Sequence, residues 1–153
     1  MNIRLAARAV LIADTGVLVP LLPGGIYPTG EDDGEDVTAV TRATTPDAFD
    51  GDGDVLPCAL VAEETAAQWG PYRTSTLGSI RVWLYQQGGR EVIEQAQVRI
   101  AALLDNRRLM IGGLPRTLRY AGYGPSGVTD PALRDAKVGW VRFQAVGLVV
   151  LPS

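Results

Sequence analysis

Hydrophobic positions recur at helical spacing in two stretches of the chain. In residues 3–13 the apolar side chains fall on one helical face, while Arg4 and Arg8 lie on another. Residues 90–104 give the clearest helical pattern, and Gly88 and Gly89 precede them as a turn. The apolar stripe of this second helix consists of Val92, Ile93, Ala96, Ile100, Leu103 and Leu104. The sequence therefore predicts two amphipathic helices.

Other stretches alternate between apolar and polar positions, as half-buried strands do. The clearest is residues 77–86, in which Ile80, Val82 and Leu84 point to one side. Arg81, Trp83 and Tyr85 point to the other side. Further strands are predicted at residues 26–27, 56–63, 117–123 and 138–148. Residues 124–137 are rich in turn residues, with one helical turn expected at 131–134.

The order of these elements predicts an α+β fold. Strands that are adjacent in sequence favour an antiparallel sheet, and the two helices would pack on one face of it. We expect the stripe of the second helix to lie on Ile80, Val82 and Leu84, because only a short turn joins helix and strand. With 153 residues, the chain is expected to form one domain, residues 1–153, with a hydrophobic core of its own.

Residues 28–54 interrupt this pattern with a long polar stretch. Structureless loops of that length are uncommon in compact domains and are usually functional or disordered. Residues 37–44 are rich in β-branched side chains, so they favour a strand or an extended arm. Val37, Val40 and Phe49 are apolar side chains that a purely solvated loop does not need. We expect residues 28–54 to form an extended acidic arm, mobile in an isolated subunit and ordered against a neighbour.

Charge is divided between the two halves of the chain. Residues 1–64 carry twelve acidic and three basic side chains, which gives a net charge of −9. Residues 65–153 carry eleven basic and five acidic side chains, which gives +6. The overall isoelectric point near 4.9 argues against a protein held to nucleic acid by phosphate contacts. The division favours a protein that fits against copies of itself or against other partners.

Little in the composition supports catalysis. The chain has no histidine, one lysine and one cysteine, Cys58, whose apolar neighbours indicate a packing role. A single cysteine without histidine excludes a Cys/His zinc site. Residues 122–127 match G-x-G-x-x-G, but no long helix is predicted after them, so we interpret them as a turn. No catalytic residue, cofactor or metal is predicted, and no stretch is long and apolar enough to span a membrane.

Asp50, Asp52 and Asp54 alternate with glycine, as at the start of a calcium loop. Counted from Asp50, the sixth and twelfth positions hold Val55 and Val61, where an EF-hand requires glycine and glutamate. A solvated acidic turn is therefore the favoured interpretation. A small metal-dependent enzyme that uses the carboxylates of residues 47–54 stays open as an alternative, which tight cation binding by a monomer would favour.

The layout of the chain resembles the small tail-terminator (tail-completion) proteins of long-tailed bacteriophages and related tail-like particles. The resemblance covers nearly the whole chain and rests on the order of the elements. Its segments are residues 24–27, 44–50, 56–61, 78–85 before the 90–104 helix, and 138–143 at the end of the sheet. The 28–54 arm is longer than in the simplest members of that family.

The resemblance implies a virion structural protein without enzymatic activity. It implies a homohexameric ring at the head-proximal end of the tail tube, assembled in the host cytoplasm. That ring stops polymerisation of the tube protein and joins the tail to the head-connector proteins, while DNA passes through its lumen without specific binding. Another neck or minor tail protein of the same fold remains an alternative.

In such a ring, the divided charge has a physical use. Closed rings need two different surface patches that fit each other, and opposite charge fixes their register. Acidic side chains could face a basic neighbour or line the lumen, and charge alone does not separate these uses. We expect the subunit interface or lumen to include Asp32, Asp33, Glu35, Asp36, Asp50, Asp52, Arg81, Trp83, Arg119, Trp140 and Arg142.

Overall fold

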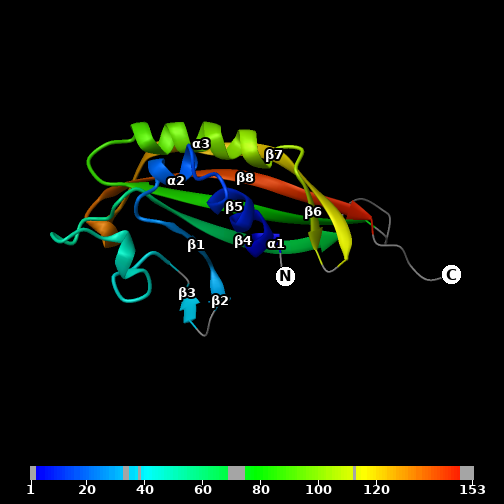
Figure 1. Ribbon diagram of the computed structural model, residues 1–153, viewed down its shortest axis with the longest axis horizontal. Helices are drawn as coiled ribbons and strands as arrows, with labels where there is room; N and C mark the ends of the chain where they lie inside the picture. The colour runs from blue at the N-terminus through cyan, green and yellow to red at the C-terminus, as the bar shows by residue number, and fades with distance from the viewer. Residues whose placement is uncertain (1–2, 33–34, 38, 69–74, 112, 149–153) are drawn as a thin grey trace.

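The computed structural model describes residues 3–32, 35–37, 39–68, 75–111 and 113–148 and has the expected α+β composition. Its α-helices are α1 (Ile3–Ile12), α2 (Leu18–Leu21) and α3 (Glu91–Leu104). Two 3₁₀ turns, η1 (Pro46–Ala48) and η2 (Pro131–Leu133), lie between strands. The strands are β1 (Ile26–Pro28), β2 (Gly30–Asp32), β3 (Glu35–Val37), β4 (Cys58–Gln68), β5 (Ser75–Gln86), β6 (Arg108–Ile111), β7 (Leu114–Asp130) and β8 (Ala136–Leu148). Figure 1 shows α3 lying along the long strands of one sheet.

The main sheet is mixed, and the expectation of a purely antiparallel sheet is wrong at one edge. Its strand order is β1-β4-β5-β8-β7-β6, and β2 pairs only with β3 in a separate hairpin. The pairs β4–β5, β5–β8, β7–β8 and β6–β7 are antiparallel, but β1 runs parallel to β4. Parallel neighbours cannot be joined by a tight turn. The chain must therefore travel back between β1 and β4, and residues 29–57 are this crossover.

One face of the sheet, which we call the inner face, forms the main core with the helices. Ile80, Val82 and Leu84 of β5 are fully buried there together with Ile93 and Ile100 of α3. Side chains of α1 and α2 and of β1, β4, β7 and β8 complete the same cluster. The apolar stripe of α3 and these three strand residues therefore belong to one hydrophobic cluster. Helix α1 contacts β1, β4 and β6, so it lies between the two edges of the curled sheet.

A strand side chain replaces the missing cap of α3. The residue before the helix, Arg90, makes no capping hydrogen bond with its side chain. Instead, the buried Gln86 at the end of β5 accepts hydrogen bonds from the backbone N–H groups of Val92 and Ile93. Its amide also donates to the carboxylate of Glu91 at 2.8 Å. The first N–H groups of a helix need such partners, so Gln86 fixes where α3 begins.

An ion pair links the end of α1 to the middle of α3. The Asp14 carboxylate accepts two hydrogen bonds from Arg99, each at 2.8 Å, and a third from the backbone N–H of Leu18 at the start of α2. The hydrogen bond from Arg99 is the main cause that lowers the pKa of Asp14 from 3.8 to about 2. A two-pronged arginine–carboxylate pair has a fixed geometry, so it sets the position of α3 relative to α1 and α2.

Strand β7 is longer than predicted and extends over seventeen residues. It contains the glycine-rich residues 122–127, so the interpretation of that segment as a turn is wrong, and no long helix follows it. The pairing with β8 shifts between Tyr120 and Gly122 and again between Gly124 and Val128. At the second shift the buried Gln97 of α3 donates to the carbonyl oxygens of Gly124 and Trp140, at 2.8 and 3.2 Å. The bulge is thereby held in place by the helix above it.

We predict that Ile100→Ala lowers the free energy of unfolding by about 2–5 kcal/mol, the usual range for truncating a buried aliphatic side chain. Ile100 is fully buried, whereas Val98, two positions earlier on α3, is 73% exposed. Val98→Ala is the matched control and should change stability by less than ~0.5 kcal/mol. Urea denaturation followed by circular dichroism measures both values. Equal effects of the two substitutions would contradict the described orientation of α3.

We further predict that Asp14→Asn destabilises the protein at neutral pH and that the difference from wild type disappears in acid. The pKa of Asp14 is lowered in the folded protein, so its contribution is complete above pH 3.8 and is lost as the pH falls through about 2. Thermal unfolding from pH 7 down to pH 2 measures this difference. Glu94→Gln, which removes an exposed pair with Arg90, is the control and should have little effect.

Candidate assembly surface

The sheet face opposite the helices, which we call the outer face, carries the aromatic and basic residues predicted from the alternation. Trp83 of β5 lies directly across from Trp140 of β8. The guanidinium carbon of Arg81 lies 4.5 Å from the ring centre of Trp140 and 5.2 Å from that of Trp83. Contacts of an arginine with two indole rings are favourable and hold the cation against the sheet. The structure therefore brings three of the predicted surface residues together.

A glycine in β7 makes this arrangement possible. Gly124 pairs with Trp140 across β7 and β8. A Cβ atom at position 124 would lie 2.0 Å from the indole nitrogen of Trp140. Any other residue would therefore displace the indole, and with it one of the two rings that contact Arg81.

Four arginines form a diagonal row across four adjacent strands of the outer face. Arg81 of β5 lies opposite Arg142 of β8. Arg119 of β7 pairs with the β8 residue that lies two positions after Arg142. Arg108 of β6 pairs with the β7 residue that lies two positions before Arg119. Side chains two apart along a strand share a face. We call Arg81, Arg142, Arg119 and Arg108 the arginine row.

The two ends of the arginine row differ in exposure. Arg81 and Arg142 are half-buried, and Arg142 donates to the hydroxyl of Ser79 at 3.1 Å. Arg119 and Arg108 are exposed, and Arg119 donates to the side-chain oxygen of Asn106. Asn106 follows α3 with a φ of 60°, in the left-handed region that asparagine tolerates after a helix. Arg119 thus belongs to the exposed end of the row at the sheet edge, apart from the two tryptophans.

The other half of the outer face is covered by the returning crossover. Val40, Ala48 and Val55 are buried in a second core cluster against β4, β5 and the η2 turn. Cys58 and Tyr85 belong to this cluster, and burial raises the pKa of the Cys58 thiol to about 12 and also raises that of the Tyr85 hydroxyl. The packing role predicted for Cys58 is confirmed. Residues 39–57 are part of the fold, so the expectation of an extended, mobile arm over 28–54 is wrong for this portion.

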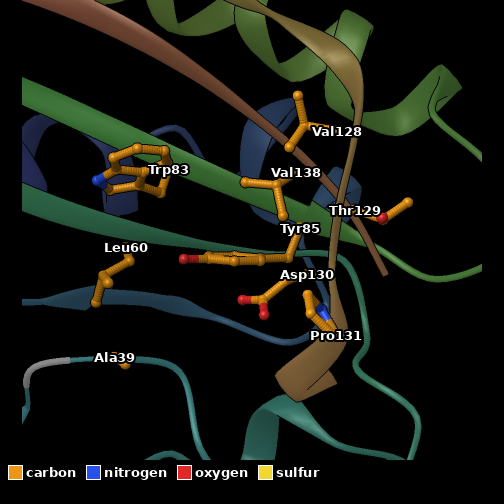
Figure 2. A pocket seen from close by; sticks show the side chains of 9 residues that line it. All are labelled: Ala39, Leu60, Trp83, Tyr85, Val128, Thr129, Asp130, Pro131 and Val138. Carbon is orange, nitrogen blue, oxygen red and sulfur yellow. The ribbon is translucent and has the colours of Figure 1, made fainter. Parts of the chain in front are cut away.

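Between the covered half and the aromatic residues lies a groove of about 370 Å³. Figure 2 shows Leu60, Trp83, Tyr85 and Val138 on its floor, Val128 to Pro131 along one wall and Ala39 on the opposite side. Its polar groups are the Tyr85 hydroxyl, the Trp83 indole, Thr129 and Asp130. Asp130 accepts a hydrogen bond from the backbone N–H of Ala132 and so begins the η2 turn.

The acidic residues predicted for the surface are placed in two separate structures. Residues 30–37 form the β2–β3 hairpin, in which Glu31 pairs with Asp36 and Asp32 with Glu35. Asp33 lies outside the described residues. Residues 50–54 form a tight turn, in which the Asp50 carboxylate accepts hydrogen bonds from the backbone N–H groups of Asp52 and Asp54. The interpretation of the second segment as an acidic turn is confirmed.

The acidic turn is bound within its own subunit. Arg134 donates to the carbonyl oxygen of Asp52 at 2.7 Å and lies 3.3 Å from the Asp54 carboxylate. Asp50 is engaged by the turn itself, so neither Asp50 nor Asp52 joins the predicted residues of the arginine row. The β2–β3 hairpin directly follows β1, the edge strand at the far side of the sheet from β6 and the exposed end of the arginine row. The predicted set of surface residues therefore separates into the arginine row with its tryptophans, the hairpin and the turn.

Two arginines of this surface were missed by sequence reasoning. Arg107 and Arg108 are exposed beside Arg119, at the start of β6. Strand β6 has only four residues and follows α3 after a three-residue turn, so its sequence shows no clear alternation of apolar and polar positions. The two adjacent arginines could have indicated an edge strand, because charged side chains are common on edge strands, where they prevent pairing with other chains.

Among the described residues, no cluster of three or more aspartate, glutamate, histidine or cysteine side chains is arranged to hold a metal ion. No helix within the described ranges has the length and hydropathy needed to cross a membrane.

Comparison with known proteins gives matches of fold alone. No family model matches the chain, and no curated protein matches it. A chain from the virion of a native gene transfer agent (GTA) particle superposes with a TM-score of 0.66 at 15% identity, over 95% of this chain and 94% of that chain. A second solved chain, whose name says nothing of function, superposes with a TM-score of 0.56 at 16% identity, over 99% of this chain and 96% of its own length. The α+β fold of this chain is thus one that also occurs in a virion component.

We predict that the returning crossover is required for stability. Val40→Asp places a charge where the side chain is 3% exposed and should lower the free energy of unfolding by at least ~2 kcal/mol. Ala39→Asp makes the same chemical change at the exposed neighbouring position and should cost less than ~0.5 kcal/mol. Urea unfolding compares the two variants. Equal stability of both would restore the interpretation of this segment as a mobile arm.

Proposed function

We propose that this chain is a structural protein of a phage-like virion and acts there as a tail terminator. Six copies form a ring at the head-proximal end of the tail tube, stop its polymerisation and join it to the head connector. The observation that carries the proposal is the end-to-end similarity of fold with a chain of the gene transfer agent virion, at a TM-score of 0.66. The sequence resemblance to tail terminators, found independently, supports the finer assignment.

The distribution of charge supports a closed ring. Acidic side chains are concentrated on the hairpin after β1, and the exposed arginines lie on β6 and β7 at the opposite edge of the same sheet. A ring is built from two different patches that meet on neighbouring copies. In the proposed subunit, the two longer helices cover one face of the sheet, and the outer face with its edges is available for assembly.

The tail tube protein, the head-connector proteins and further copies of this chain are the proposed partners, with DNA passing through the ring. The groove on the outer face and the aromatic–arginine cluster beside it are suited to protein contacts, since tryptophan, tyrosine and arginine are enriched at interfaces. We propose that Trp83, Trp140, Arg81 and Arg142 lie at such a contact within the assembled particle. The proposed location is the virion, after assembly in the host cytoplasm.

We predict that particle-producing cells lacking this protein make tail tubes longer than normal, because nothing stops addition of tube subunits. Electron microscopy of particles measures tube length, and complementation with the wild-type gene is the control. Image reconstruction of normal particles should show six copies in one ring between tube and connector. Tubes of normal length without attached heads would instead identify another neck protein, and a chain absent from the particle would contradict a virion role.

A further inference from the structure

The β2–β3 hairpin has a built-in electrostatic cost. Its register places Glu31 opposite Asp36 and Asp32 opposite Glu35, so both cross-strand pairs consist of two acids. Like charges that face each other across an antiparallel pair are destabilising. A hairpin of three-residue strands is also marginal on its own. A cationic partner that neutralised these four carboxylates would remove the repulsion and stabilise the hairpin.

The exposed end of the arginine row has the complementary property. Arg107 directly precedes β6, Arg108 is the first residue of β6, and Arg119 lies on the neighbouring strand with a hydrogen bond to Asn106. All three side chains are exposed. The one acidic residue within this turn, Asp105, already accepts a hydrogen bond from the backbone N–H of Tyr120 at 2.9 Å. This group of arginines, 107, 108 and 119, is called the basic corner below.

The hairpin and the basic corner are attached to opposite edges of one sheet. β1, which leads into the hairpin, is the first strand in the spatial order, and β6 is the last. Adjacent strands are about 4.8 Å apart, so five steps correspond to roughly 24 Å along the sheet. Helix α1 lies between the two edges, in contact with β1 on one side and β6 on the other. Figure 1 shows the hairpin and β6 on different sides of α1.

We propose that the acidic hairpin of one copy docks on the basic corner of a second copy. This inference rests on the proposed ring and names the two surfaces that join its subunits. Each copy then donates its hairpin to one neighbour and receives a hairpin from the other. Such a contact is heterologous, and repetition of it by a fixed rotation closes a ring. The attraction is electrostatic, so it gives register and partner choice and weakens as salt is added.

The test is a charge exchange between two variants of the full chain. In the first, Glu31, Asp32, Glu35 and Asp36 are all changed to Lys, which keeps the like-charge pairs of the hairpin but reverses their sign. In the second, Arg107→Glu and Arg108→Glu reverse the basic corner. Native mass spectrometry and sedimentation measure assembly of each variant alone and of an equimolar mixture. Each variant alone should associate at least tenfold more weakly than wild type.

The mixture decides whether the contact is between copies. A reversed hairpin fits the reversed corner of the other variant, and the unaltered hairpin fits the unaltered corner. We therefore expect the mixture to recover wild-type assembly with the two variants alternating in equal numbers. A mixture that stays dissociated would overturn the proposal, and so would a wild-type chain that does not self-associate at any concentration. Neither result depends on finding the protein in a particle, so each is separable from failure of the proposed function.

Two controls exclude simpler explanations. Arg42→Glu with Arg90→Glu changes the net charge by the same amount at exposed positions elsewhere and should leave assembly unchanged. Asp32→Lys with Asp36→Lys makes both cross-strand pairs opposite in charge, so the hairpin folds at least as well yet loses most of its net charge and should dock poorly. Binding of short duplex DNA is measured in parallel. If corner reversal abolished DNA binding but left assembly intact, the corner would be a phosphate-binding surface and the proposal would be wrong.

Discussion

Burial of the inner sheet face under α3 is the interaction on which the rest of the structure depends. Ile80, Val82 and Leu84 can be removed from water only if a helix lies along β5, and the apolar stripe of α3 supplies it. Gln86 and the Asp14–Arg99 pair then fix the start of α3 and its position against α1. Because alternate strand residues point to opposite faces, this choice sends Arg81, Trp83 and Tyr85 to the outer face.

The outer face has two parts with different surroundings. At one end, the returning crossover buries Tyr85 and Cys58 beneath Val40, Ala48 and Val55. At the other end, Arg81 lies against two tryptophans, and the arginine row continues to the exposed corner of β6. A sheet covered on both faces over half its length is rigid there, so the charged half is presented on a firm support. Its side chains are positioned by strands rather than by loops.

The sequence was sufficient to predict an element wherever its hydrophobic periodicity matched the face that is buried. Residues 77–86 and 90–104 were predicted nearly to their ends, because one apolar face in each element is buried against the other. The outer-face positions of Arg81, Trp83, Trp140 and Arg142 followed from alternation alone. The sequence did not show which of these residues lie opposite each other. That register depends on the pairing of β5 with β8, and most paired residues are fifty-five or more positions apart in the chain. Strand β6 and helix α2 were not predicted, because each has four residues, too few to show a periodic hydrophobic pattern.

The largest error concerned residues 28–54, and its cause is topological. High polarity and dense acid suggested an arm separate from the domain. The parallel pairing of β1 with β4 instead requires the chain to return before β4 can begin, and a polar segment with a few apolar side chains performs this return. The sequence did contain an indication that this segment packs on the domain. Its widely spaced apolar residues Val40, Ala48 and Val55 are the ones that are buried. A sheet with only antiparallel neighbours would not have needed the segment at all.

The anchoring of the crossover at both ends has a consequence for how this protein can change over evolutionary time. β1 is held by β4 and α1, and the chain from Val40 onward is held by its own buried cluster. The hairpin between them joins two anchored segments, so a change in its length or charge leaves both anchors in place. In the proposed ring, new partner preferences can arise there by a few substitutions while the sheet stays as it is. Recognition and fold would then depend on different residues of the same crossover.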